Sequence, residues 1–176
     1  FSMNNKELKN TAKKLVNAFN KGKLIAPLSD KFTKNSNIAN QLRTECESLV
    51  KSPVIGFKAG GTGKAMLKKW GEKEPFYAAI FKKNLLKSNG SVKINKYTLG
   101  IELEVFFQSK KLFFNTTKKI TDKNVSSVIQ YVGPCIEIVG YRQKKKGLSG
   151  LGDLISDFGA NVKFLIGKKQ KFKRLP

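Results

Sequence analysis

The segment IELEVFF, residues 101–107, decides the fold, because its apolar and acidic residues alternate as they do along a β-strand. Residues two apart in a strand share a face, so Glu102 and Glu104 point to one side and their apolar neighbours to the other. Phe106 extends the glutamate side, which is therefore not simply a water-facing surface. Two carboxylates about 7 Å apart along a strand repel each other unless a lysine or a divalent cation neutralises them. From this pair alone, a solvated face with two ordinary acids is the simpler interpretation.

A third glutamate changes that interpretation. Glu137 lies in CIEIVGY, residues 135–141, where it alternates with Ile136 and Ile138. The chain has only 12 acidic residues against 35 basic ones, so three isolated glutamates in two apolar strands indicate a shared site with oxygen ligands. Three carboxylate oxygens that leave positions open for water and substrate suit Mg²⁺ or Mn²⁺.

Lys58 is the candidate catalytic residue. It ends the predicted strand VIGFK, residues 54–58, beside glycines, from where its side chain can reach into a site. There it could bind a substrate carboxylate or move a proton. Taken alone, an ordinary surface lysine is the simpler interpretation. The following AGGTGKAM does not form a phosphate-binding P-loop, because Lys58 stands at the first glycine position and Ala65 follows Lys64.

The order of predicted elements, helices first and strands afterwards, indicates the α+β class and one domain. We expect an N-terminal helical segment over residues 4–53, a β-rich metal-site core over 54–167 and a basic tail over 168–176. The expected helices cover 4–20, the stretch between Ser36 and Pro53, a turn at 66–70, and a helix from Thr121 through Val132 that Gly133 breaks. The expected strands cover 54–58, 91–94, 97–107, 135–141 and 162–166.

Charge and composition exclude several functions. The chain has no histidine, and Cys46 and Cys135 are far apart, which argues against a zinc site and a histidine base. The net charge of +23 raises nucleic acid as a partner, but no base-reading motif accompanies it, so we expect only weak, non-specific phosphate contacts. No apolar window spans a membrane and no signal peptide is visible. We expect a reducing, intracellular setting, the cytoplasm or an organelle matrix.

Six runs of the sequence, spread over residues 25–167, carry a resemblance to a known family. They are IAPLSD, VIGFKAGGTGKAM, EPFYAAIF, GIELEVFF, PCIEIVGYR and SDFGANVKFLIG. In order and spacing they resemble the 2-oxopent-4-enoate hydratase and 4-oxalocrotonate decarboxylase family of the fumarylacetoacetate hydrolase superfamily. The resemblance implies a mixed β-sheet, or β-roll, core. It also implies that Glu102, Glu104 and Glu137 bind Mg²⁺ or Mn²⁺ and that Lys58 matches the lysine of the family's G-x-K-I-G motif.

The activity implied by the resemblance is that of a divalent-metal-dependent lyase. Such a hydratase or decarboxylase acts on a small 2-oxo acid through an enolate. The chain departs from the family at Phe76, where an aspartate is usual, and at Ala160 and Asn161, where serines are usual. Family members also continue with further strands, so we expect a C-terminally shortened fold whose apolar faces are covered by a second copy, another subunit or the basic tail. The alternative function is that of a catalytically impaired relative, a structural subunit of a larger assembly with or without RNA.

Overall fold

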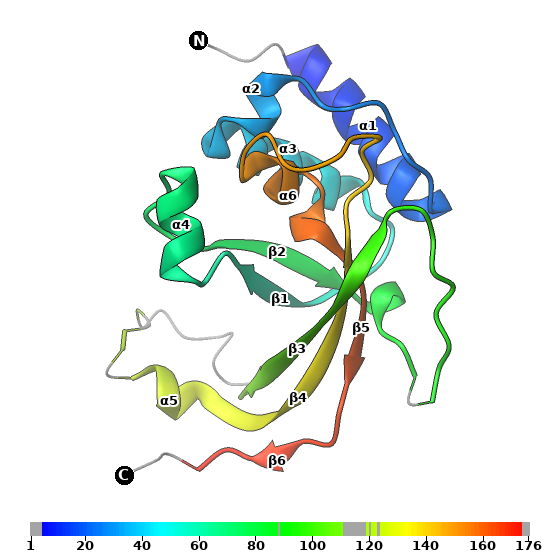
Figure 1. Ribbon diagram of the computed structural model, residues 1–176. Coiled ribbons are helices and arrows are strands. Elements are labelled where there is room, and N and C mark those ends of the chain that lie inside the picture. Colours follow the sequence, from blue (N-terminus) through cyan, green and yellow to red (C-terminus); the bar gives the residue numbers. More distant parts are fainter. Residues whose placement is uncertain (1–4, 88, 111–118, 120, 123, 174–176) are drawn as a thin grey trace.

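The computed structural model describes residues 5–87, 89–110, 119, 121–122 and 124–173 (Figure 1). Helices lead and strands dominate the second half, which confirms the predicted α+β class. The helices are α1 (Asn5–Lys21), α2 (Asp30–Thr33), α3 (Ser36–Leu49), α4 (Lys64–Trp70), α5 (Val125–Val128) and α6 (Gly152–Ser156), with the short 3₁₀ helices η1 (Lys82–Asn84) and η3 (Phe158–Ala160). The strands are β1 (Val54–Gly60), β2 (Phe76–Phe81), β3 (Thr98–Ser109), β4 (Ile129–Gly140), β5 (Asn161–Ile166) and β6 (Gln170–Lys171).

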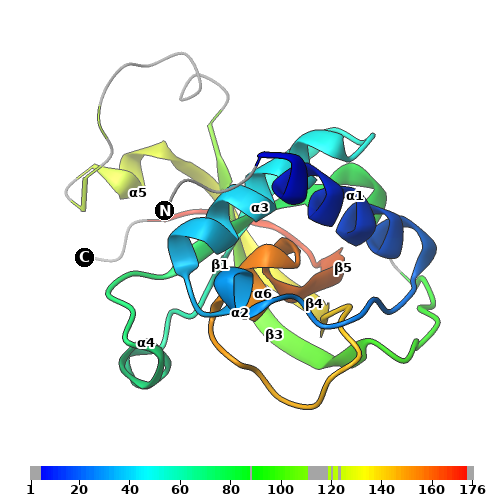
Figure 2. The same cartoon turned by 90° about the horizontal axis from the view of Figure 1, so that it is seen from above.

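The helical part forms from local sequence signals. The apolar stripe of α1 is buried, and the helix ends where Gly22 adopts a positive φ of 61°. Asn35 caps α3, because its side-chain oxygen accepts a hydrogen bond from the Ile38 backbone N–H at 3.1 Å. In Figure 1 α1, α3 and α6 lie together above the strands, and Figure 2 looks down onto the molecule from that side. Stacked rings of Phe19 and Phe158, with centroids 4.1 Å apart, connect α1 to the turn that precedes β5.

The strands form two antiparallel sheets. One contains β1 and β2, and the other has the order β3-β4-β5, with β6 also paired to β4. Strand β4 is therefore central and β3 lies at an edge. The register of β3 against β4 places Glu102 opposite Glu137 and Glu104 opposite Cys135. In Figure 1 these two long strands run side by side below the helices, and β1 and β2 lie between them and α3. Within the described residues, no helix is long and apolar enough to cross a membrane.

Two sequence predictions are wrong. No strand forms over 91–94, because this stretch has no pairing partner among the described residues, and Ile94 remains exposed. The helix expected to run from Thr121 through Val132 is only the single turn α5. The β-branched residues that follow pair with β3 instead, with Val132 opposite Phe107. Tertiary pairing thus overrides the helical spacing of these apolar residues.

Gly133 does not break the chain at this point but lies inside β4. A Cβ atom there would lie 2.6 Å from the Phe106 ring and 2.8 Å from the Lys168 carbonyl oxygen, so only glycine fits. Pro134 lies where the neighbour of β4 changes from β5 to β6, which is where a proline can be tolerated. Residues 170–171 of the basic tail form β6, so part of the tail folds back onto β4.

Candidate metal centre

Strand pairing brings the three predicted glutamates together. Glu102 and Glu104 share one face of β3, and Glu137 occupies the same face of β4, directly opposite Glu102. Each side chain offers one carboxylate oxygen, and these three oxygens all lie within 4.8 Å of one another. The convergence expected from the two sequence strands is therefore observed. We call these three residues the carboxylate cluster.

Burial distinguishes the members of the cluster. Glu137 is 2% exposed, whereas Glu102 and Glu104 are exposed. Burial raises the pKa of Glu137, because a low-dielectric surrounding disfavours its charged form. Lys58 opposes this effect, and the two neighbouring carboxylates add to it. Burial and the neighbouring carboxylates thus both disfavour the charged form of Glu137.

Lys58 supplies the one ion pair of the cluster within the described residues. Its Nζ donates to Oε1 of Glu137 at 2.8 Å, and its side chain is 10% exposed. This contact joins the two sheets, since Lys58 comes from β1 and Glu137 from β4. One ammonium group faces three carboxylates, so two negative charges remain when all three are ionised. An oxygen-ligated divalent cation matches that excess in charge and in ligand type.

A strained turn lies against Lys58. Phe158, Gly159 and Ala160 all have positive φ angles, of 55°, 65° and 62°, and two of them are not glycine. A Cβ atom on Gly159 would lie 2.7 Å from the Ala78 Cβ and 3.5 Å from the Lys58 Cδ, so the backbone approaches the lysine closely. The turn thus forms one wall beside the ion pair.

Phe76 and Asn161, where the resemblance led us to expect other polar residues, serve packing and turn formation. Phe76 is buried and packs with Leu151 and Ile155. The Asn161 side-chain nitrogen donates to the carbonyl oxygen of Phe158 at 2.8 Å and thereby holds the strained turn. Neither residue adds a charged group to the carboxylate cluster.

Cys135 is a member of this site that the sequence analysis did not assign. It precedes Glu137 by two residues in β4 and pairs with Glu104, so it belongs to the same face. Burial raises its pKa, and the neighbouring Glu137 and Glu104 raise it further. Both effects favour the protonated thiol. The period-two spacing in PCIEIV could have identified it.

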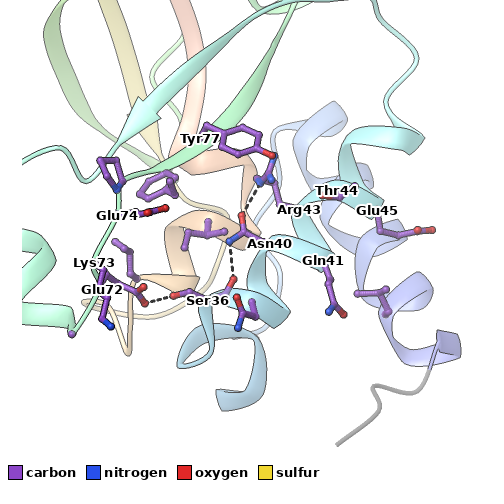
Figure 3. A pocket seen from close by; sticks show the side chains of 17 residues that line it. Ser36, Asn40, Gln41, Arg43, Thr44, Glu45, Glu72, Lys73, Glu74 and Tyr77 are labelled. Atoms are coloured by element: carbon purple, nitrogen blue, oxygen red, sulfur yellow. Dashed lines mark hydrogen bonds between the residues drawn. The ribbon is translucent and has the colours of Figure 1, made fainter. Parts of the chain in front are cut away.

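A larger cavity of about 910 Å³ lies elsewhere, between α3 and the segment that leads into β2, and contains none of the three clustered glutamates (Figure 3). Some of its polar side chains bind one another. Ser36 donates to Glu72, Asn40 donates to the Ser36 carbonyl oxygen at 2.9 Å, and Arg43 donates to Asn40 at 3.3 Å. Arg43 also lies over the ring of Tyr77. None of the residues predicted from the sequence to form a site lines this groove.

Comparison with known proteins agrees with this architecture. The fold is that of 4-oxalocrotonate decarboxylase. Two structures of that enzyme from Pseudomonas putida match, one complexed with magnesium and adipate (TM-score 0.74) and one with calcium and acetate (TM-score 0.73), each at 17% sequence identity. The matches cover 94% of this chain but only 64% and 63% of theirs. The fumarylacetoacetate hydrolase type of fold is thereby confirmed. No family model and no curated protein matches the sequence.

Proposed function

We propose that the protein is a divalent-metal-dependent lyase that acts on a small 2-oxo acid. Glu102, Glu104 and Glu137 would hold Mg²⁺ or Mn²⁺, and Lys58 would act beside them. The observation that carries this proposal is the approach of three carboxylate oxygens to within 4.8 Å of one another with a single lysine as counter-charge. The similar fold of a decarboxylase complexed with magnesium and adipate supports both the cation and an anionic substrate.

A bound divalent cation supplies Lewis-acid stabilisation of the negative charge that develops on a 2-oxo group. The side chains of this chain supply position and protons. Glu137 is fixed by β4 and by Lys58, so it defines the buried side of the centre. The exposed Glu102 and Glu104 define the side that substrate can reach. Lys58 carries the ammonium group nearest the cluster, and we assign it to binding the substrate carboxylate or to transferring a proton. Hydration and decarboxylation share the enolate, and both remain within the proposal.

The test measures cation binding before activity. Titration calorimetry of the metal-free chain with Mn²⁺ and with Mg²⁺ should give one site. Glu102→Gln should weaken binding by at least about 10-fold. Removal of a residue that only hydrogen-bonds to a metal ligand already lowers metal affinity by about 10- to 100-fold. Glu74→Gln is the matched control, since Glu74 is an exposed glutamate outside the cluster and undergoes the same charge change. Equal affinities of the wild type and Glu102→Gln would refute the ligand assignment.

Activity is tested with 2-oxopent-4-enoate for hydration and 4-oxalocrotonate for decarboxylation, each followed by loss of ultraviolet absorbance. Metal-dependent turnover that Lys58→Met abolishes would support the lyase. Metal binding without turnover of either compound would instead favour the second candidate function.

That second candidate is a catalytically impaired relative that serves as a subunit of a larger assembly. The specific observation in its favour is an exposed apolar face on β3, where Leu99, Ile101, Leu103, Val105 and Phe107 all face outward. We propose that this face binds a second copy of the chain. Such association is compatible with the lyase as well. The net charge of +23 adds non-specific attraction for RNA, which should weaken steeply with salt.

A further inference from the structure

A second, smaller cavity lies beside β5 and contains none of the clustered glutamates. Its volume is about 250 Å³, far above the roughly 10–15 Å³ that one water molecule needs. Lys163 lines it from β5. The next residue, Phe164, pairs with Glu137, so Lys163 points away from the carboxylate cluster. We call this space the cationic cavity. It is lined by Phe19, Asn20, Lys83, Asn84, Tyr97, Arg142, Val162 and Lys163.

Three cationic side chains line this cavity, and no acidic side chain does. Arg142 pairs with Asp157, its Nη1 donating to Oδ1 at 2.7 Å, and this pair is buried. Lys83 and Lys163 have no acidic partner within the described residues. The Lys83 ammonium donates to the Asn20 side chain, and that of Lys163 donates to the Lys83 carbonyl oxygen at 3.0 Å. Burial lowers the pKa of both lysines, and the charge of Lys163 lowers that of Lys83 further.

Two buried polar atoms of the lining residues have no hydrogen-bond partner in the part of the chain that the structure describes. One is Nε of Arg142, a donor, in a residue 1% exposed; the other is Oδ1 of Asn84, an acceptor, in a residue 4% exposed. The orientation of the Asn84 amide is set, because its nitrogen donates to the Val162 carbonyl oxygen at 2.7 Å. A buried polar group left unsatisfied is unfavourable, and both residues line the cavity, so a ligand there that both accepts and donates would satisfy the two atoms.

We propose that the cationic cavity binds a small oxyanion that carries one hydroxyl group, such as hydrogen phosphate. Its charged oxygens accept from Arg142 Nε and from the ammonium groups of Lys83 and Lys163. Its hydroxyl donates to Asn84 Oδ1. The same chemistry is presented by inorganic phosphate, by the end of a phosphomonoester and by a 2-hydroxycarboxylate. Lys83 is exposed, so the ligand has a route from solvent.

The experiment is calorimetry on the full chain in EDTA, which removes divalent metal from the carboxylate cluster. The probes are inorganic phosphate, sulfate and glycolate, each against chloride at equal ionic strength. Phosphate should bind with a stoichiometry of one. Sulfate should bind more weakly, because it has no hydroxyl at neutral pH for Asn84. Glycolate binding more tightly than phosphate would identify a hydroxycarboxylate, and the reverse order would identify phosphate or its monoester; both results support the proposal.

Three variants with the same charge change locate the binding. Lys83→Gln and Lys163→Gln should each weaken phosphate binding by about 10- to 100-fold, the range for one charge-assisted hydrogen bond. Lys82→Gln is the control, because Lys82 is the exposed neighbour of Lys83 and does not line the cavity. Circular dichroism verifies that each variant is folded, and the exposed Lys83 position keeps the test valid if Lys163→Gln unfolds.

Three results would overturn the proposal. Phosphate binding no stronger than chloride binding would mean that the cavity holds only water. An equal loss of affinity in Lys82→Gln would reduce the effect to general attraction by a basic surface. Sulfate binding as tightly as phosphate would remove the role of Asn84 and with it the ligand class.

Discussion

The carboxylate cluster and the cationic cavity have opposite charges but are built in the same way. Each contains one ion pair that strand ends or strand faces hold in place, Glu137 with Lys58 at 2.8 Å and Arg142 with Asp157 at 2.7 Å. Each then adds two further side chains of the majority sign that have no opposite partner within the described residues. In each site the ion pair fixes the geometry, whereas the two surplus charges favour the binding of a ligand of opposite charge.

The two ion pairs differ in how Arg142 and Glu137 can respond when their partners are lost. A guanidinium group stays charged under all ordinary conditions, so Arg142 cannot neutralise itself. A carboxylate can take up a proton, and burial already raises the pKa of Glu137. The pair in the cationic cavity should therefore contribute more to stability than the pair in the carboxylate cluster.

The largest expected effect comes from breaking the Arg142 pair. Asp157→Asn should lower the free energy of unfolding by about 3–5 kcal/mol, because it leaves a buried guanidinium without its counter-charge. Urea denaturation measures this. The control is Asp30→Asn, which breaks an exposed pair with Lys34 and should cost at most about 1 kcal/mol. Similar losses in the two variants would mean that burial of the Arg142 pair is not what matters.

The next effect should change sign with metal. Without metal, Glu104→Gln should raise the free energy of unfolding by about 0.2–1 kcal/mol, because it relieves repulsion within the cluster. With Mn²⁺ at 100 times its dissociation constant, the wild type should gain about 2.7 kcal/mol, and the variant should lose most of that gain. Thermal and urea unfolding with and without Mn²⁺ measure both arms. A solvated face of ordinary acids predicts no change of sign.

Periodicity in the sequence could predict the carboxylate cluster because a strand repeats every two residues. The spacing of Glu102 and Glu104 puts them on one face, and the isolation of Glu137 in an apolar strand marked it as unusual. Periodicity could not supply the register that sets Glu102 opposite Glu137. That register depends on long-range pairing between β3 and β4, which no local pattern of the sequence specifies.

The cationic cavity could not be predicted, for a different reason. Lys83, Asn84, Arg142 and Lys163 come from separate parts of the chain, and lysine is so abundant here that no single lysine carries a signal. Long-range pairing also explains the two wrong predictions. The residues that begin β4 have helical spacing, and the stretch 91–94 has a strand-like composition. Whether a strand forms depends in both cases on pairing with a neighbouring strand.

A smaller effect is the pH dependence of stability that Lys163 of the cationic cavity contributes. Burial lowers the pKa of Lys163, whereas an unfolded lysine titrates near about 10.4. Between these values the unfolded state holds more protons, so the contribution of Lys163 to stability rises with pH. The free energy of unfolding of the wild type minus that of Lys163→Gln should therefore rise as the pH approaches the unfolded value of about 10.4 from below.

Subtracting the free energy of unfolding of Lys163→Gln from that of the wild type removes an opposing contribution from Cys46. Burial raises the pKa of this thiol, so its own contribution to stability falls as pH rises, equally in both proteins. Saturating phosphate should flatten the difference, because a bound anion favours the charged lysine and raises its pKa. A difference that falls with pH would contradict the inferred desolvation of Lys163.

The smallest effect on stability is expected at Leu103, which lies between the two exposed glutamates but on the opposite face of β3. Leu103 is 82% exposed, so Leu103→Lys should change the stability of the monomer by no more than about 0.5 kcal/mol.

The effect of Leu103→Lys on association should nevertheless be large. Strand β3 is an edge strand with a row of outward apolar side chains, and such an edge favours association. Sedimentation at micromolar concentration should show the wild type as a dimer or larger and Leu103→Lys as a monomer. Ile94→Lys is the matched control, because Ile94 is 79% exposed but lies outside the sheet. Salt should strengthen the wild-type association, since it screens repulsion between two chains of charge +23 and leaves the apolar contact intact. A wild-type monomer with a cooperative melt would show that this apolar face is stable in water without a partner.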